Sequence, residues 1–83
     1  MTCGQIVIVK SGRDKGHAMV VLEVSEGYLF LVDGRLRTLK KPKKKKVKHV
    51  QITHHFVNMQ PESGRDLQDA DIRKQLTAFA GRR

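Results

Sequence analysis

Aromatic and sulfur-containing residues are scarce in this sequence. Its 83 residues include no tryptophan, one tyrosine and one cysteine, and aromatic residues make up 5% of the chain. The single cysteine, Cys3, excludes an internal disulfide, which is typical of proteins from a reducing compartment such as the cytoplasm. The core must therefore consist mainly of Val, Ile and Leu, and a chain this short buries only about 60% of the surface that its unfolded form exposes. We expect one small domain without a deep catalytic cleft.

Long hydrophobic runs are also missing. The apolar run Ile6–Val9 ends at Lys10, which is far short of a membrane span or of the apolar part of a signal peptide. Attachment to a membrane surface through lysines needs an apolar anchor beside the charge, and lysines surround Pro42 instead. The sequence therefore predicts a cytoplasmic protein that does not associate with membranes.

Positive charge is in excess, and the excess is local. Residues 35–48 hold 9 of the 17 Lys and Arg residues and no acid, while the other 8 basic residues are matched by 8 Asp and Glu. The basic residues of this segment are Arg35, Arg37, Lys40, Lys41, Lys43, Lys44, Lys45, Lys46 and Lys48. Such a density of cations attracts a polyanion by releasing its condensed counterions. Nucleic acid is therefore the first partner to consider, through this set of residues.

Three apolar segments, the first rich in β-branched residues, predict an antiparallel sheet. Residues 5–11, 17–24 and 28–32 contain mainly Val, Ile and Leu, which suit an extended, pleated backbone. Residues 12–16 join the first two segments, and their two glycines accept positive φ. A short connection that contains glycine typically makes a hairpin. We expect the first three strands to be consecutive antiparallel neighbours.

The lysine-rich segment separates these strands from a further apolar stretch. We predict a loop over residues 40–46, because Pro42 and four consecutive lysines interrupt regular strand pairing. Residues 47–53 resume an alternation and predict the strand that closes the sheet. Its expected inward residues are Val47, Val50 and Ile52.

The end of the chain predicts a linker and a helix. Residues 61–65 contain Pro, Ser and Gly, and a helix over about Asp69–Ala80 follows. The apolar stripe of this helix is Ile72, Leu76 and Phe79. We expect this stripe to pack on the barrel, and the alternative is that it docks a partner. Arg73 and Lys74 should face water.

The first part of the chain also carries a longer motif. The segments GQIVIVKSGRDKG (residues 4–16), VLEV (21–24) and VDG (32–34) closely resemble the KOW motif of ribosomal proteins and transcription elongation factors. Gly16 stands where the motif has its characteristic glycine. The continuation through residues 36–50 looks like the branch related to large-subunit ribosomal proteins of archaea and eukaryotes.

This resemblance implies both a fold and a binding site. It implies a mainly β fold, with an SH3-like barrel of about five strands over residues 1–60 and a linker and C-terminal helix over residues 61–83. In ribosomal members the turn after the first strand touches ribosomal RNA, as do neighbouring loops. Carried over by position, the RNA-binding residues are Ser11, Arg13, Lys15 and His17. The residues agree by themselves, because a tight glycine turn leaves N–H groups free and its flanking Arg and Lys suit phosphate.

The sequence departs from the family pattern at two places. Ile8 stands where the family often has a polar residue, and residues 18–20 are more apolar than usual. An exposed apolar strip of this kind docks either a protein partner or the terminal helix.

The remaining aromatic and histidine residues give weaker functional signals. Tyr28, Phe30 and Phe56 are too few for a base-stacking platform and are expected in the core, which favours recognition of RNA by phosphate and shape. His54 and His55 point to opposite faces of a strand and cannot both bind one metal ion. We expect no metal site and no cofactor, and we expect one of His49, His54 and His55 to form a hydrogen bond with a phosphate or sugar of the RNA.

The leading hypothesis is a non-enzymatic RNA-binding protein, associated with the ribosome as a monomer. Its partner would be structured RNA, in particular ribosomal RNA, with a ribosomal protein or translation factor as a possible neighbour. The alternative is an adaptor that binds a transcription or translation protein through the barrel and the terminal helix. In that case the lysines only assist.

Overall fold

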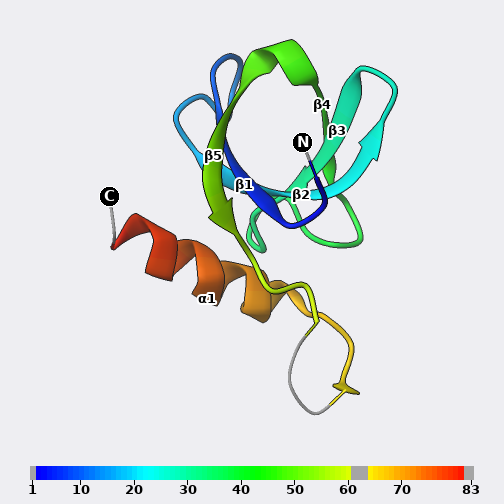
Figure 1. The fold of residues 1–83 in the computed structure, drawn as a ribbon, viewed down its shortest axis with the longest axis vertical. Helices are drawn as coiled ribbons and strands as arrows, with labels where there is room; N and C mark the ends of the chain where they lie inside the picture. The colour runs from blue at the N-terminus through cyan, green and yellow to red at the C-terminus, as the bar shows by residue number, and fades with distance from the viewer. Residues whose placement is uncertain (1, 61–63, 82–83) are drawn as a thin grey trace.

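The chain forms a curled antiparallel sheet with one helix packed outside it (Figure 1). The computed structural model describes residues 2–60 and 64–81. Its elements are β1 (Gln5–Val9), β2 (Ala18–Ser25), β3 (Tyr28–Val32), β4 (Lys43–Lys46), the 3-10 helix η1 (Val47–His49), β5 (Val50–Phe56) and α1 (Asp69–Ala80). The strand order is β4-β3-β2-β1-β5, and β4 and β5 are the edges of an incompletely closed barrel. The expected class, a mainly β barrel-like fold of five strands with a C-terminal helix, is confirmed.

The meander of the first three strands follows the prediction closely. β1 pairs with β2 and β2 pairs with β3, both antiparallel. The turn between β1 and β2 contains Gly12 and Gly16, which both have φ of 85°. This region of backbone space is costly for residues with a Cβ, so the two glycines make the hairpin possible.

The predicted loop over residues 40–46 is wrong for its second half. Lys43–Lys46 forms β4, which pairs with β3 in a register that runs from Leu31↔Lys43 to Tyr28↔Lys46. Pro42 precedes the strand instead of interrupting it, and β4 lies at the sheet edge, where lysines are common. A lysine stem is apolar, so a lysine can cover a core while its ammonium reaches water. The prediction of a loop considered the charge of these lysines and not the apolar part of their side chains.

The fifth strand begins later and runs further than predicted. Val47–His49 is η1, and β5 extends to Phe56. Val50 is buried as expected, but Ile52 is 46% exposed. Ile52 lies opposite Val7 in the register, on the edge strand beside the opening of the sheet, so the sheet itself covers it on one flank only.

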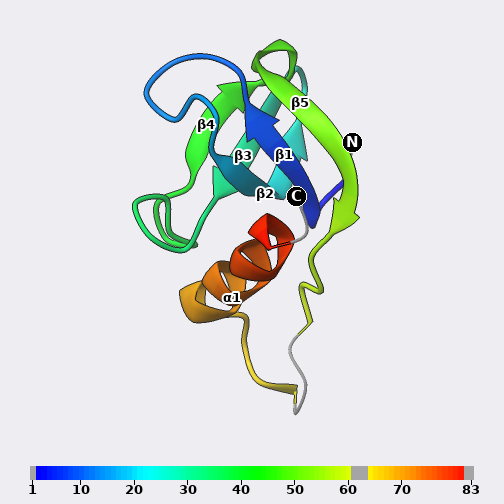
Figure 2. The same ribbon diagram turned by 90° about the vertical axis from the view of Figure 1, so that its left-hand side faces the viewer.

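Two apolar clusters stabilise the fold, one on each face of the sheet. The inner cluster is Val7, Val9, Met19, Val21, Leu29, Leu31 and Val50. The outer cluster is Ile6, Val20, Val32, Val57, Ile72 and Phe79. Figure 2 shows α1 lying across the outside of the sheet, where this second cluster forms. The helix stripe therefore packs on the barrel as expected.

The apolar residues 18–20 are accounted for by these two clusters. Met19 belongs to the inner cluster, and Val20 lies in the outer cluster together with the helix. Of the two occupants considered for this strip, the structure has the terminal helix. The aromatic expectation was wrong for Phe56, which is 60% exposed, whereas Tyr28 and Phe30 are half-buried.

Local hydrogen bonds fix both the start of α1 and its place on the barrel. Gln68 is the N-cap and forms a capping box with Asp71, which also pairs with Arg65 at 2.6 Å. Arg73, predicted to face water, is half-buried and donates to the carbonyl of Gly34 at 2.6 Å. The Asp69 carboxylate accepts the backbone N–H of Leu39 at 2.8 Å. The helix is thereby tied to the connection between β3 and β4.

The predicted linker over residues 61–65 is only partly described, because residues 61–63 lie outside the described part of the chain.

Over residues 2–60 and 64–81, no helix is both long and apolar enough to cross a membrane.

Candidate nucleic-acid interface

The turn between β1 and β2 presents two of the predicted RNA-binding side chains to solvent. Arg13 and Lys15 are exposed, while Ser11 is half-buried. The backbone holds this turn through Lys15 N–H to the Gly12 carbonyl (3.2 Å) and Gly16 N–H to the Val9 carbonyl (2.7 Å). The turn is therefore an ordered support for two cationic side chains.

The same turn leaves backbone donors without partners. Among the described residues, the N–H groups of Gly12, Arg13 and Asp14 make no hydrogen bond within the chain. Successive free N–H groups in a turn form a concave site that favours an anion. The turn thus offers a phosphate the partial positive charges of its backbone N–H groups and the full charges of the Arg13 and Lys15 side chains.

Arg37 has a structural role that the sequence did not indicate. Its guanidinium pairs with Asp14 at 3.2 Å, and the Asp14 side chain is almost fully buried. Asp14 belongs to the turn and Arg37 to the connection between β3 and β4, so this ion pair ties the two segments together. An arginine already paired with a buried carboxylate is a poor candidate for a phosphate contact.

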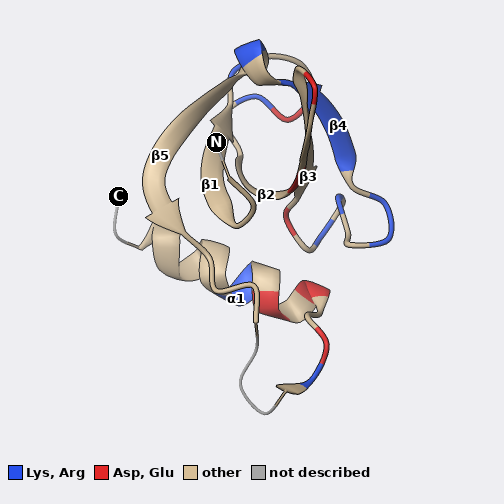
Figure 3. Cartoon of the chain, turned by 45° about the vertical axis from the view of Figure 1, so that its right-hand side comes forward, with Lys and Arg blue, Asp and Glu red and all other residues tan. Residues whose placement is uncertain are grey.

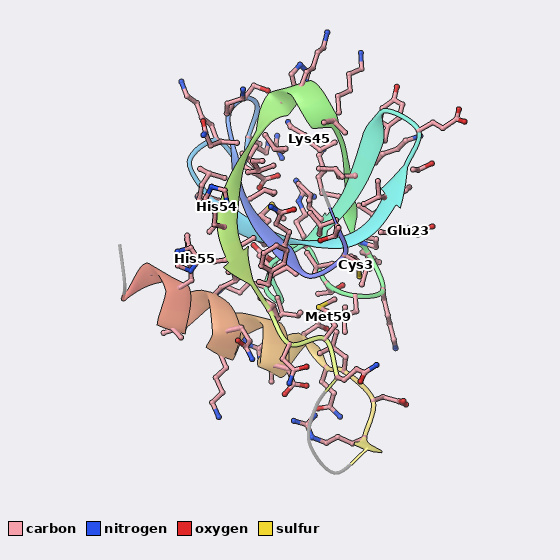
Figure 4. The ribbon with its side chains drawn as sticks, in the orientation of Figure 1. Cys3, Glu23, Lys45, His54, His55 and Met59 are labelled. Atoms are coloured by element: carbon pink, nitrogen blue, oxygen red, sulfur yellow. The ribbon has the colours of Figure 1, made fainter. Side chains whose placement is uncertain are left out.

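Lys45 brings the lysine segment to the glycine turn. Its Nζ lies 2.7 Å from the position that a Cβ on Gly12 would occupy. Figure 4 shows Lys45 at the upper end of the barrel, below η1. Lys43 and Lys45 lie opposite the buried Leu31 and Leu29 and are themselves half-buried. The two basic elements predicted from the sequence therefore meet at one end of the molecule.

His49 reports how closely the lysines gather at this end. Its carbonyl accepts the N–H of Lys10 at 2.8 Å. The pKa of His49 is lowered, first by burial and then by the positive charges of neighbouring lysines. Those lysines are Lys48, Lys45, Lys46 and Lys10. We call Lys10, Arg13, Lys15, Lys45, Lys46 and Lys48, with the turn 12–16, the cationic end.

Lys10 was missed at the sequence level, although a signal for it was present. Lys10 directly follows the first strand and precedes the glycine turn, so it had to lie at the same end as that turn. His49 follows the lysine run, but its contact with Lys10 depends on the pairing of β5 with β1.

The remaining predicted residues lie outside the cationic end. Lys44 is exposed and its Nζ stands 4.4 Å from the centre of the Tyr28 ring. Lys40 and Lys41 are exposed in the connection between β3 and β4. His17 and Arg35 line a shallow groove of about 280 Å³ between the sheet and α1, together with Arg73. The structure therefore divides the predicted residues among the cationic end, the rest of β4 with the connection before it, and the groove beside α1.

The histidines of β5 have separate surroundings. His55 contacts the ring of Phe79 edge-on, with the ring centres 5.1 Å apart, and so joins β5 to α1. His54 is exposed. Within the described residues, no group of three His, Cys, Asp or Glu side chains is close enough together to hold a metal ion.

Charge is distributed unevenly over the molecule (Figure 3). Basic residues follow β4 and the turn after it, and acidic residues mark the first turn of α1 at the opposite end as well as the β2–β3 hairpin and the β1–β2 turn. Among the described residues, the ion pairs of the carboxylates are formed with Arg37 and Arg65. The lysines of the cationic end are thus left for an external anion.

Comparison of the chain with models of protein families and with curated proteins found no match. The features of the chain that bear on function are therefore its sequence motif, its fold and the geometry of the cationic end.

Proposed function

We propose that this chain is a non-enzymatic, cytoplasmic RNA-binding protein of the KOW type that associates with the ribosome. In this proposal the cationic end holds structured RNA through its phosphates and its shape. The observation that carries the proposal is the position of Lys45 Nζ against Gly12, because it joins the lysine segment and the glycine turn in one surface.

The electrostatics of the cationic end favour a polyanion. Burial is the largest cause of the lowered pKa of His49, and the charges of four lysines are the next causes. Ammonium groups that lie close enough to act on one imidazole also repel one another. A chain of phosphates relieves that repulsion and releases its own counterions into solution. The free N–H groups of the turn add donors for one phosphate at a fixed place.

The docked helix weakens the case for an adaptor. An adaptor would use apolar surface, and the strip at residues 18–20 is already buried by the inner cluster and by α1. This strip is therefore not available to a protein partner.

A salt titration tests this proposal. If about six phosphates are neutralised, the logarithm of the affinity for a structured RNA falls with the logarithm of salt at a slope of magnitude about 4 to 5. The measurement is fluorescence anisotropy of a labelled RNA hairpin at several salt concentrations. An affinity that hardly changes with salt would contradict the proposal and support the adaptor.

Two variants at different places on the molecule supply the control, and their effects are compared per charge removed. Lys46→Gln with Lys48→Gln removes two charges from the cationic end and should reduce the slope by about 1.4 to 1.8. Lys74→Gln removes a charge from the exposed surface of α1 and should leave the slope nearly unchanged. Equal effects per charge would mean that RNA binding has no fixed location on the molecule.

A further inference from the structure

The outer face of β3 is only partly covered by α1. Tyr28, Phe30 and Val32 alternate with the buried Leu29 and Leu31 and therefore point outward. Val32 is fully buried in the outer cluster with the helix, but Tyr28 and Phe30 are half-buried. The hairpin of β2 and β3 extends away from α1 (Figure 1), which leaves the start of β3 uncovered.

Each of these two aromatic residues lies opposite a lysine. Tyr28 pairs with Lys46 and Phe30 pairs with Lys44, and residues opposite each other in a sheet share a face. Both lysines are exposed, and Lys44 Nζ lies 4.4 Å from the centre of the Tyr28 ring. On this face of the β3–β4 pair, two aromatic rings of β3 thus lie beside two lysines of β4.

The contact of Lys44 with Tyr28 is weak enough to be replaced. A cation over an aromatic ring at an exposed site changes an equilibrium constant by a factor of about 2 to 5. A nucleobase stacked on an aromatic side chain contributes a factor of about 5 to 150. A base can therefore displace the ammonium from the ring, and the freed ammonium can then pair with the phosphate of the same nucleotide.

We propose that Tyr28, Phe30, Lys44 and Lys46 bind one unpaired nucleotide of the RNA, with its base stacked on Tyr28 and its phosphate held by the lysines. This inference rests on the proposed function, because Lys46 also belongs to the cationic end and places the nucleotide next to the bound backbone. It changes the sequence-based interpretation, in which the aromatic residues were assigned to the core.

The neighbouring residues on β2 fix the orientation of the nucleotide. Glu23 lies opposite Phe30 and Ser25 lies opposite Tyr28. A phosphate would be repelled by the exposed Glu23 carboxylate, so the phosphate lies toward β4 and the base toward β2. There the carboxylate can accept a hydrogen bond from an exocyclic amino group of the base.

The fluorescence of the protein itself provides the test. The chain has one tyrosine and no tryptophan, so its intrinsic emission comes from Tyr28 alone. A single-stranded adenosine oligonucleotide of about ten residues, a length within the usual range of a binding site, should quench this emission. Inorganic polyphosphate should bind to the lysines with much less quenching. Equal quenching by both polyanions would overturn the inference.

Two substitutions separate stacking from simple contact. Tyr28→Leu should weaken binding of the single-stranded oligonucleotide by about 5- to 150-fold, while Tyr28→Phe, which keeps the ring, should bind nearly as the wild type does. Phe56→Leu removes an exposed aromatic ring from β5 and serves as the matched control. Circular dichroism verifies that each variant is folded. Unchanged affinity in a folded Tyr28→Leu protein would overturn the inference.

Failure of the inference is distinguishable from failure of the proposed function. The protein could bind a fully paired RNA hairpin in a salt-dependent way while single strands fail to quench Tyr28. That result would contradict the nucleotide site and leave the proposed function intact. If the wild-type protein binds neither RNA, both proposals are wrong.

Discussion

Neighbouring lysines of β4 have different surroundings because successive residues of a strand point to opposite faces. Lys43 and Lys45 lie over Leu31 and Leu29 and are half-buried. Lys44 and Lys46 are exposed on the other face. The four identical residues should therefore contribute to stability and to the proposed RNA binding in different proportions.

Two double variants measure this difference. Lys44→Gln with Lys46→Gln should change the free energy of unfolding by less than about 0.5 kcal/mol, as is usual for exposed positions. Lys43→Gln with Lys45→Gln shortens two stems that cover the inner cluster and should cost on the order of 1 kcal/mol. Urea denaturation gives both values. Equal losses in the two proteins would show that the alternation has no energetic meaning.

The lowered pKa of His49 predicts a pH dependence of RNA binding. Burial and the nearby lysines disfavour its charged form, and a bound phosphate would favour it. Binding should therefore take up a proton, so affinity should rise as pH falls below the ordinary value of 6.5. In the free protein the sign is opposite: the stability present above 6.5 is lost as the pH falls from there through the lowered pKa of His49. NMR titration of His49 with and without RNA checks the direction.

The other histidines supply the control for that titration. His49→Gln should remove most of the pH dependence of affinity, whereas His54→Gln, on the exposed part of β5, should retain it. A dependence that survives His49→Gln would assign the proton to another group.

At the scale of elements, α1 depends on contacts at its first turn. Asp71 accepts the N–H of Gln68 at 2.9 Å and pairs with Arg65 at 2.6 Å. Asp69 and Arg73 bind the connection between β3 and β4 on the other side. The first turn therefore holds together the linker, the helix and the segment that leads into β4.

Acid should weaken this turn in a defined pH range. The hydrogen bond from Arg65, and then that from Gln68, lowers the pKa of Asp71 from 3.8 to about 2. Because the folded pKa is lower than the unfolded one, the contribution of Asp71 is present above about 3.8 and is lost as the pH falls through about 2. Thermal unfolding followed over that range should show the loss.

Asp71→Asn is the reference for this experiment. It should be less stable at neutral pH and should lose less on acidification, because its side chain does not titrate. Parallel acid curves for the two proteins would contradict the assignment.

The elements differ in how far the sequence determined them. Residues 28–32 and 69–80 were predicted with their observed bounds, because an apolar run with two aromatic residues between turns and a helical stripe are local patterns. β4 was missed because its stability comes from pairing with β3 and from apolar lysine stems, which a scale based on charge does not register. Ile52 was misplaced because its exposure depends on the opening of the sheet.

The candidate site was predictable to a similar extent. The lysine segment and the glycine turn were expected to lie together in the folded chain, and the structure has Lys45 Nζ next to Gly12. The ion pair of Arg37 with Asp14 was not, because the two residues are 23 positions apart and adjacent only in the folded chain.

At the scale of the whole molecule, salt should act on stability and on binding in opposite directions. The net charge of +9 is carried by a molecule with extents of 36 × 28 × 22 Å, and the Debye length is about 8 Å at physiological salt, so the repulsion acts mainly among the lysines of the basic segment. Screening relieves their repulsion in the folded state but weakens attraction for RNA.

We therefore expect added sodium chloride to raise the free energy of unfolding by on the order of 1 kcal/mol, or about 4 to 8 °C in melting temperature for a domain of this size. The same salt should weaken RNA binding. Calorimetry of the wild type and of the Lys44→Gln, Lys46→Gln protein tests this, because the variant has less repulsion and should gain less. A stability that falls with salt would mean that attractive ion pairs dominate the molecule.

The outer cluster also bears on where this chain can be cut. Ile6, Val20 and Val32 are sealed from water by side chains of α1, so a fragment ending at residue 60 would carry a bare apolar patch on three adjacent strands. The barrel and the helix thus share one apolar cluster, and a shortened chain that keeps its fold must retain α1.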